Sequence, residues 1–207
     1  MGTRTGGDFV NKTLKDTRKL VVLGLMLAIT MILDFTPLGA IPMGTVEATI
    51  THIPTIITGI ILGPVAGLIM GLAFGLISFF HALIRPVSPF SLFFINPIIS
   101  ILPRMFIGVA AYYGYAIALK LFKSKLAPIA IGVGAFIGSM TNTVLVLGAL
   151  SLIYGSRIEA MLLEAGLSSK AYLWALGVAG TNGLMEGIVS VVLVTAICSV
   201  YFKQYKS

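Results

Sequence analysis

One stretch of this chain constrains its fold more than any other feature. Residues 48–84 form a run of 37 positions without aspartate, glutamate, lysine or arginine. As one helix rising about 1.5 Å per residue, this run would extend about 55 Å, whereas the apolar core of a bilayer is about 30 Å thick. The run is broken at Leu62-Gly63-Pro64, because glycine favours the end of a helix and proline its start. The sequence therefore predicts two membrane-spanning helices here, at about 48–62 and 64–83.

The composition of the whole chain supports a membrane protein. Hydrophobic residues make up 57% of the 207 positions, charged residues make up 10%, and the mean hydropathy is +1.04. A soluble domain has about 25% charged residues, so this chain cannot cover a surface that faces water. Disordered chains are poor in apolar residues and are excluded too. The single cysteine excludes a disulfide framework and a metal site built from several thiolates.

The positions of the basic residues predict how the chain is oriented. Ten of the fourteen lie in three clusters, before residue 20, at 120–125 and after residue 202. Clusters of lysine and arginine between apolar segments mark the cytoplasmic side of a membrane protein. Binding of nucleic acid needs a basic face on a soluble module, which this distribution does not provide. We therefore expect contact with a lipid bilayer and no nucleic-acid partner.

We expect an all-α membrane protein with six transmembrane helices and both termini in the cytoplasm. The other four spans are predicted at 20–35, about 97–119, about 127–153 and about 171–202. The predicted organisation is a cytoplasmic tail at 1–17, a single six-helix transmembrane domain at 18–203 and a C-terminal tail at 204–207. Residues 1 to about 15 are expected to be a disordered tail or a leader. The external connections are then 36–47, 84–96 and 154–170, and their length indicates that something small is received from outside.

Polar side chains at membrane depth are the candidates for function, because an intramembrane charge usually faces a partner or a wet cavity. The predicted substrate-binding residues are Arg104, Asn142, Asn182, Asn96, His81, Arg85, Glu47 and His52, with Ser88 beside them. We expect them to line a cavity open to the outside, and we place Glu186 too deep to take part. A guanidinium suits a carboxylate because its planar fork stays charged and donates two hydrogen bonds, while asparagines suit amide and hydroxyl groups.

Each candidate also has a structural alternative. Arg104 could pair with Glu186 as an intramembrane ion pair, and the two asparagines could join helices through hydrogen bonds. His52 could brace the start of a helix before Ile53-Pro54. Arg85 could extend to the membrane interface, and Asp34 could simply mark the outer end of the first span.

Small residues four positions apart predict close helix packing. Gly24 and Ala28 form such a pair on the first span, and Gly67, Gly71 and Gly75 form a longer series on the third. Small residues let helices approach each other within one molecule or against another subunit. Packing within the molecule is the default interpretation.

The sequence lacks several motifs of catalysis. It contains no G-x-x-x-x-G-K-[ST], so the chain has no P-loop for ATP. It also contains no G-x-S-x-G or H-E-x-x-H. We expect a transport protein rather than an enzyme, with no catalytic residues, cofactor or metal. An autonomous secondary carrier is the alternative, although such carriers often show inverted repeats and several acids at mid-membrane.

Three segments carry a family resemblance: Thr36-Pro-Leu-Gly-Ala-Ile-Pro42, Thr51-His-Ile-Pro54, and Ile61-Leu-Gly-Pro64 before a helix with spaced glycines. They resemble the substrate-binding S components of energy-coupling factor (ECF) vitamin transporters, and the resemblance covers about residues 18–203. The combination of His-Ile-Pro, His81-Ala-Leu-Ile-Arg-Pro86 and Asn96-Pro97 looks most like the pantothenate-type members.

The resemblance implies a six-helix, vitamin-capturing subunit in the bacterial cell membrane. Such a subunit associates with a transmembrane coupling subunit (EcfT) and two ABC-type ATPase subunits. The coupling contact maps to Gly24 and Ala28, with glycine where alanine is more usual. The implied substrate is a small carboxylate-bearing vitamin bound from the external side. Pantothenate is favoured, and folate, a pyridoxine-type vitamin and riboflavin stay open.

Overall fold

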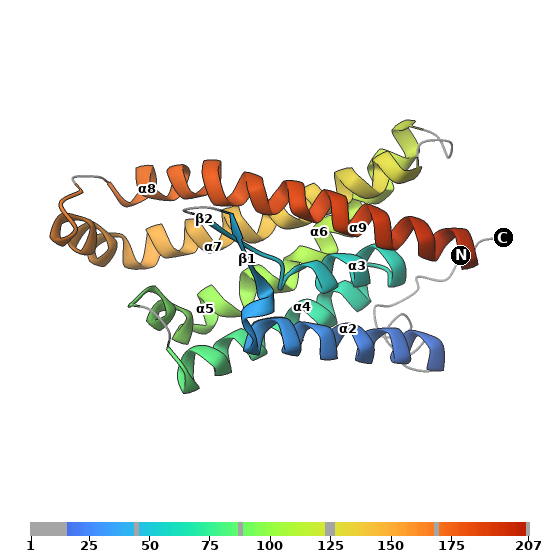
Figure 1. Cartoon of the computed structure of the whole chain (residues 1–207), viewed down its shortest axis with the longest axis horizontal. Coiled ribbons are helices and arrows are strands. Elements are labelled where there is room, and N and C mark those ends of the chain that lie inside the picture. Colours follow the sequence, from blue (N-terminus) through green and yellow to red (C-terminus); the bar gives the residue numbers. More distant parts are fainter. Residues whose placement is uncertain (1–15, 44–45, 87–88, 123–126, 168–169, 206–207) are drawn as a thin grey trace, which may run out of the picture.

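The computed structural model describes residues 16–43, 46–86, 89–122, 127–167 and 170–205. Within these residues the chain is an elongated bundle whose helices lie roughly along one long axis (Figure 1). The predicted tail at 1–15, Ser88 and most of the basic cluster at 120–125 lie outside the described residues.

Six helical segments form the described bundle, and their bounds lie close to the predicted spans. They are α2 (Thr17–Phe35), α3 (Ile53–Leu62), α4 (Pro64–Ile84), α5 (Pro97–Ser100) with α6 (Leu102–Phe122), α7 (Ala127–Glu164), and α8 (Ala171–Val178) with α9 (Leu184–Tyr205). Four segments are long and apolar enough to cross a membrane: Pro64–Ile84, Pro97–Phe122, Ala127–Glu164 and Ala171–Gln204. The number of crossings and the side of each terminus stay predictions.

A short β-hairpin, which the sequence pattern did not indicate, precedes α3. Strand β1 (Ala40–Met43) pairs antiparallel with β2 (Val46–Thr49), and the N–H of Ile50 donates to the Gly39 carbonyl at 2.8 Å. The helix predicted from residue 48 therefore begins only at Ile53, where Pro54 occupies the first turn.

Helix α7 runs further than predicted. It was expected to end at about residue 153, but it continues to Glu164 beyond a break at Tyr154, where φ is −119° and ψ is 18°. The Tyr154 ring stacks on Phe93 with 4.7 Å between centroids. The connection predicted at 154–170 thus contains a further stretch of helix.

Glycines bring three helices into backbone contact. Gly63 separates α3 from α4 with φ of +100°, a conformation that favours glycine, and Pro64 starts α4 at once. A Cβ on Gly59 would overlap the Gly108 carbonyl, and one on Gly67 would lie 2.9 Å from the Gly108 carbonyl carbon. The series that begins at Gly67 therefore serves packing within the molecule, as the default interpretation held.

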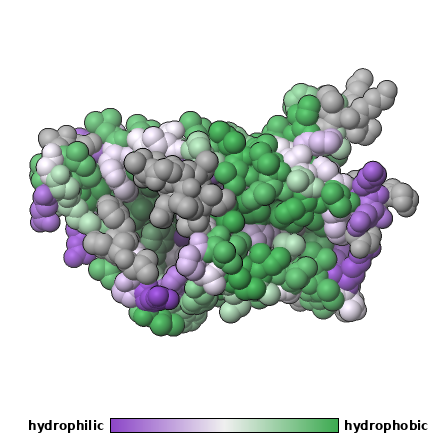
Figure 2. All heavy atoms as spheres, viewed as in Figure 1, coloured by the Kyte–Doolittle hydropathy of each residue, from purple (hydrophilic) through white to green (hydrophobic). Residues whose placement is uncertain are grey.

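The outer surface of the bundle is apolar over its middle part. Figure 2 shows a broad hydrophobic region there, with hydrophilic residues gathered towards the two ends. Among the described residues, large apolar side chains such as Leu25, Ile117, Leu152 and Val200 are more than half exposed. The core between α3, α6, α7 and α9 contains fully buried side chains, among them Ile56, Ile107, Ile131 and Val194. A surface this apolar fits lipid as its surroundings.

Candidate functional site

A cavity of about 500 Å³ lies beside the hairpin, with Thr49 of β2 among its lining residues. This volume is typical of sites for small molecules. Apolar and polar side chains from five of the six helical segments, from the connections beside them and from the hairpin line it: Leu33, Asp34, Thr36, Gly39, Thr49, Thr51, Phe74, His81, Phe94, Arg104, Asn142, Thr143, Val146, Leu147, Val178, Asn182, Gly183 and Glu186. Four of the residues predicted from the sequence thus line the same cavity: Arg104, Asn142, Asn182 and His81.

Arg104, on the first turn of α6, is the buried cation of the cavity. Its side chain is 8% exposed, and its Nη1 donates to the carbonyls of Ile99 at 3.1 Å and Ser100 at 3.0 Å. The rings of Phe74 and Phe94 lie 5.1 and 5.0 Å from the guanidinium carbon. Its Nε is buried and has no hydrogen-bond partner among the described residues. The neighbours therefore fix the guanidinium and leave donor capacity for a ligand.

Glu186, on the first turn of α9, lines the cavity and does not pair with Arg104. Its Oε1 accepts hydrogen bonds from the Thr49 N–H at 3.0 Å and the Thr49 hydroxyl at 2.5 Å. No ion pair joins Glu186 to a cation within the described part of the chain. The prediction that Glu186 lies below the cavity was wrong, because the hairpin reaches down to α9 and extends the cavity wall to this depth.

Two asparagines lie in the cavity wall on neighbouring helices. Asn142 on α7 has a buried Oδ1 without a partner among the described residues. Asn182 lies in the π-helical turn Ala179–Gly183 between α8 and α9, and its Oδ1 accepts from the Thr181 hydroxyl at 3.2 Å. Such π-turns are frequent at functional sites. The two amides do not bond to each other, so the cavity keeps their hydrogen-bonding capacity.

A histidine and an aspartate meet at the edge of the cavity. His81 Nδ1 on α4 lies 2.8 Å from Asp34 Oδ2 on α2, and the Phe35 ring packs 5.0 Å from the imidazole. His81 was predicted as a site residue, whereas Asp34 was expected only to mark the end of its span. The contact orients the imidazole of His81 and gives the carboxylate of Asp34 a hydrogen-bond partner.

Two predicted site residues hold helices in place outside this cavity. His52 is buried, and its Nε2 lies 3.1 Å from Ser139 Oγ and 3.0 Å from Ser190 Oγ, which joins the start of α3 to α7 and α9. Asn96 caps α5, because its Oδ1 accepts from the Ile98 N–H at 3.0 Å. Both side chains match the bracing and capping roles that short polar groups play at helix ends.

The remaining two predicted residues are also placed elsewhere. Arg85 is exposed and borders a small cavity of about 90 Å³, which shares His81 and Phe94 with the larger one. Glu47 lies opposite Pro42 in the hairpin, and its side chain is outside the described part of the structure.

Sequence reasoning missed the two aromatic rings beside Arg104, the acid Asp34 and the hairpin residue Thr49. Phe74 lies within the glycine series of α4, where a phenylalanine reads as ordinary apolar packing. Phe94 lies in the 3₁₀ segment Pro89–Ile95, which the sequence presents as a loop. The only feature of the sequence that could have indicated the Asp34–His81 contact is the presence of an acid on one predicted span and a histidine on another.

The exposed face of α2 differs from the glycine series of α4. Gly24 and Ala28 are both exposed, and a Cβ added to Gly24 would meet no described atom within 4 Å. Gly24 therefore makes no close contact within the described bundle, and with Ala28 it forms an exposed surface of small residues on α2.

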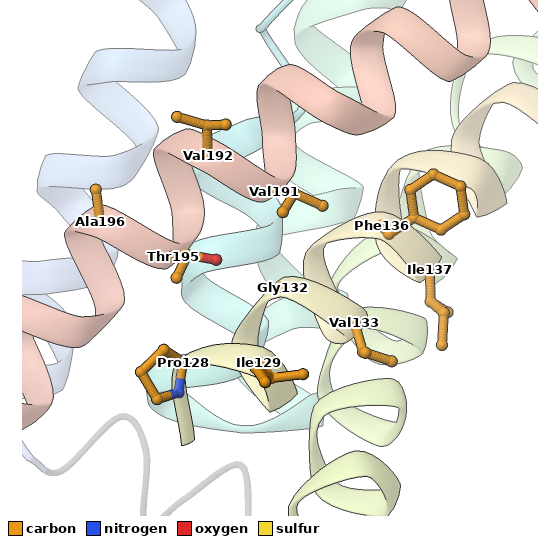
Figure 3. A pocket seen from close by; sticks show the side chains of 10 residues that line it. All are labelled: Pro128, Ile129, Gly132, Val133, Phe136, Ile137, Val191, Val192, Thr195 and Ala196. Atoms are coloured by element: carbon orange, nitrogen blue, oxygen red, sulfur yellow. The ribbon is translucent and has the colours of Figure 1, made fainter. Parts of the chain in front are cut away.

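A larger cavity, of about 800 Å³, opens between α7 and α9 in the other half of the bundle (Figure 3). Ile129 and Val133 flank it from α7, while Val191 and Val192 flank it from α9. Thr195 supplies the one polar side chain among its lining residues. It lacks the convergent polar groups that fix a small polar ligand, so the smaller cavity is the candidate site.

Comparisons with known proteins agree on one family. A model of the substrate-specific component of ECF transporters matches residues 18–198. The pantothenic acid transporter PanT of Lactococcus lactis subsp. cremoris is 34% identical over 170 residues, which cover 73% of this chain and 76% of that protein. A solved structure of the S component of a bacterial ECF transporter matches with a TM-score of 0.56 at 16% identity, over 92% of this chain and 99% of that chain. This last likeness shows the fold.

Proposed function

Because the chain belongs to the substrate-specific (S) components of ECF transporters, we propose that it captures pantothenate from the external side of the bacterial cell membrane for an ATP-driven importer. The family match confirms the resemblance seen in the sequence. It also confirms the prediction of a multi-pass membrane subunit that is not an enzyme. The substrate rests on one observation above all: a buried arginine with an unpartnered Nε faces a cavity of about 500 Å³. The relation to a pantothenic acid transporter supports the same substrate.

The chemistry of pantothenate matches the walls of the cavity. Its carboxylate would bind Arg104, whose guanidinium lies beside the rings of Phe74 and Phe94 and can donate two parallel hydrogen bonds to a carboxylate. Leaving a buried donor without a partner costs about 1–3 kcal/mol, and a bound carboxylate removes this cost. The amide and hydroxyl groups would bind Asn142 and Asn182, which line the same cavity.

Whether a predicted residue lines the cavity decides whether we keep it in the proposed substrate site. His81 stays in the proposed site because it lines the cavity. We assign no direct contact with substrate to Asn96, Arg85 or His52, since none of them lines it. Glu47 stays a prediction.

We also propose an orientation and a coupling surface. The start of α2 and the ends of α6 and α9 lie at one end of the bundle, which supports a cytoplasmic position for both termini (Figure 1). The exposed Gly24 and Ala28 would dock against the transmembrane coupling subunit, EcfT. The absent P-loop is consistent with energy from two ABC-type ATPase subunits.

Isothermal titration of the purified chain tests the substrate. We expect tight binding of pantothenate and no comparable binding of folate, pyridoxine or riboflavin. Absence of pantothenate binding would overturn the assignment, and tight binding of one of the others would replace it. Reconstitution in liposomes distinguishes an S component from an autonomous carrier, because the autonomous carrier would transport without ATP or partner subunits.

A further inference from the structure

We infer that Glu186 determines which form of the substrate the cavity accepts: it binds the hydroxyl end of a hydroxy-carboxylate and excludes the form phosphorylated on that hydroxyl. This inference rests on the proposed function, which assigns the carboxylate end to Arg104. It adds a role for the opposite end of the substrate.

The geometry of Glu186 leaves one carboxylate oxygen for a ligand. Both hydrogen bonds from Thr49 fall on Oε1, and these two donors hold the side chain in the cavity wall. Among the described residues, Oε2 has no hydrogen-bond partner. Both Thr49 donors engage Oε1, so the acceptor capacity of Oε2 is not used by them. Oε2 therefore suits a ligand group that carries a proton to donate, such as a hydroxyl.

Glu186 and Arg104 belong to different walls of the cavity. Helix α7 packs against both α6 and α9, and the two charged side chains are not within ion-pair distance of each other. The other acid of the lining, Asp34, is already engaged by His81. The cavity thus offers a cation in one wall and a free acceptor in another, which matches a molecule with a carboxylate at one end and a hydroxyl at the other.

A phosphate on the hydroxyl end would reverse this match. A phosphomonoester carries a charge of about −1.5 to −2 at neutral pH and has little to donate. Placed beside Glu186, it would repel the carboxylate in surroundings of low dielectric, where like charges interact strongly. Glu186 is therefore a repulsive element that sets specificity against a closely related molecule.

Titration of the purified full-length chain with pantothenate and with its terminal phosphate ester tests the inference. We expect the wild-type chain to prefer pantothenate by about a hundredfold, close to 3 kcal/mol. Glu186→Gln keeps the shape and an acceptor but removes the charge. It should narrow this preference about tenfold, mainly through tighter binding of the phosphate ester.

Thr49→Val is the matched control, because it removes one hydrogen bond to Oε1 and keeps the charge of Glu186. It should weaken both ligands in proportion and leave the preference unchanged. A wild-type preference retained in Glu186→Gln would overturn the inference, as would equal affinity of the wild-type chain for both ligands.

A measurement on the wild-type chain covers the case in which Glu186→Gln does not fold. Pantothenate without its terminal hydroxyl should bind about tenfold more weakly, because Oε2 is left without a donor. Equal affinity of the two compounds would overturn the inference while the proposed function stands. Failure of the wild-type chain to bind pantothenate itself would instead overturn the proposed function.

Discussion

At the scale of single residues, Arg104 shows how a charge is kept usable inside a bundle. Two carbonyls accept from Nη1 and two aromatic rings lie beside the guanidinium, so these neighbours restrict the side chain before any ligand arrives. A donor group that is already fixed loses little conformational entropy on binding, which raises affinity.

Replacing Arg104 with alanine should weaken pantothenate binding at least about a hundredfold. Hydrogen bonds to charged groups contribute about 1.5–3 kcal/mol each, and two of them would be lost. Arg104→Lys should give an intermediate loss, since lysine keeps the charge but not the planar fork. Titration measures both variants, with thermal unfolding in detergent as the control for the fold. Wild-type affinity in Arg104→Ala would contradict the carboxylate contact.

Phe94→Leu tests whether the aromatic neighbours position the guanidinium. A cation–π contact contributes about 0.5–2 kcal/mol, so pantothenate should bind about two- to thirtyfold more weakly. The alcohol analogue of pantothenate, which has no carboxylate, should bind the variant as it binds the wild-type chain. Equal losses for the acid and the alcohol would show that Phe94 only shapes the cavity.

At the scale of helices, His52 acts as a polar tie between α3, α7 and α9. His52→Ala would leave a void and two serine hydroxyls without their partner, which is expected to destabilise the chain by about 2–4 kcal/mol. The unfolding temperature in detergent should fall, while pantothenate affinity at low temperature should change little. Ser139→Ala, which removes a single contact, is the milder control. A loss of affinity without a loss of stability would return His52 to the substrate site.

The two glycine motifs should respond to the same substitution in opposite ways. Gly24→Leu adds bulk to an open surface, so it should leave stability and ligand affinity unchanged and reduce transport in the presence of the partner subunits. Gly67→Leu is the matched control, because its side chain would collide with the backbone of Gly108 and destabilise the isolated chain. Reduced ligand affinity in Gly24→Leu would show that α2 contributes to packing within the bundle.

At the scale of the whole molecule, hydropathy and breaker residues predicted the order of the helices and many of their bounds, but not the start of α3 or the end of α7. The break at Gly63 and Pro64 and the bounds of α4 follow from local chemistry. The hairpin does not, because its position depends on a contact between Thr49 and Glu186, which are 137 residues apart in the chain. The cavity could be predicted only as a set of polar residues. Which of these share a wall depends on helix rotation and packing, which the spacing of polar residues leaves open.

The single-residue turn at Gly63 also has a mechanical consequence. Helices α3 and α4 have no linker between them, and the glycines at their crossing fix both backbones against α6. The close approach of the three backbones leaves little room for one of these helices to shift against another. The hairpin residue Thr49 and Phe94 of the 3₁₀ segment line the cavity and lie outside these three helices. The cavity is thus built partly on a tightly packed unit and partly on segments outside that unit.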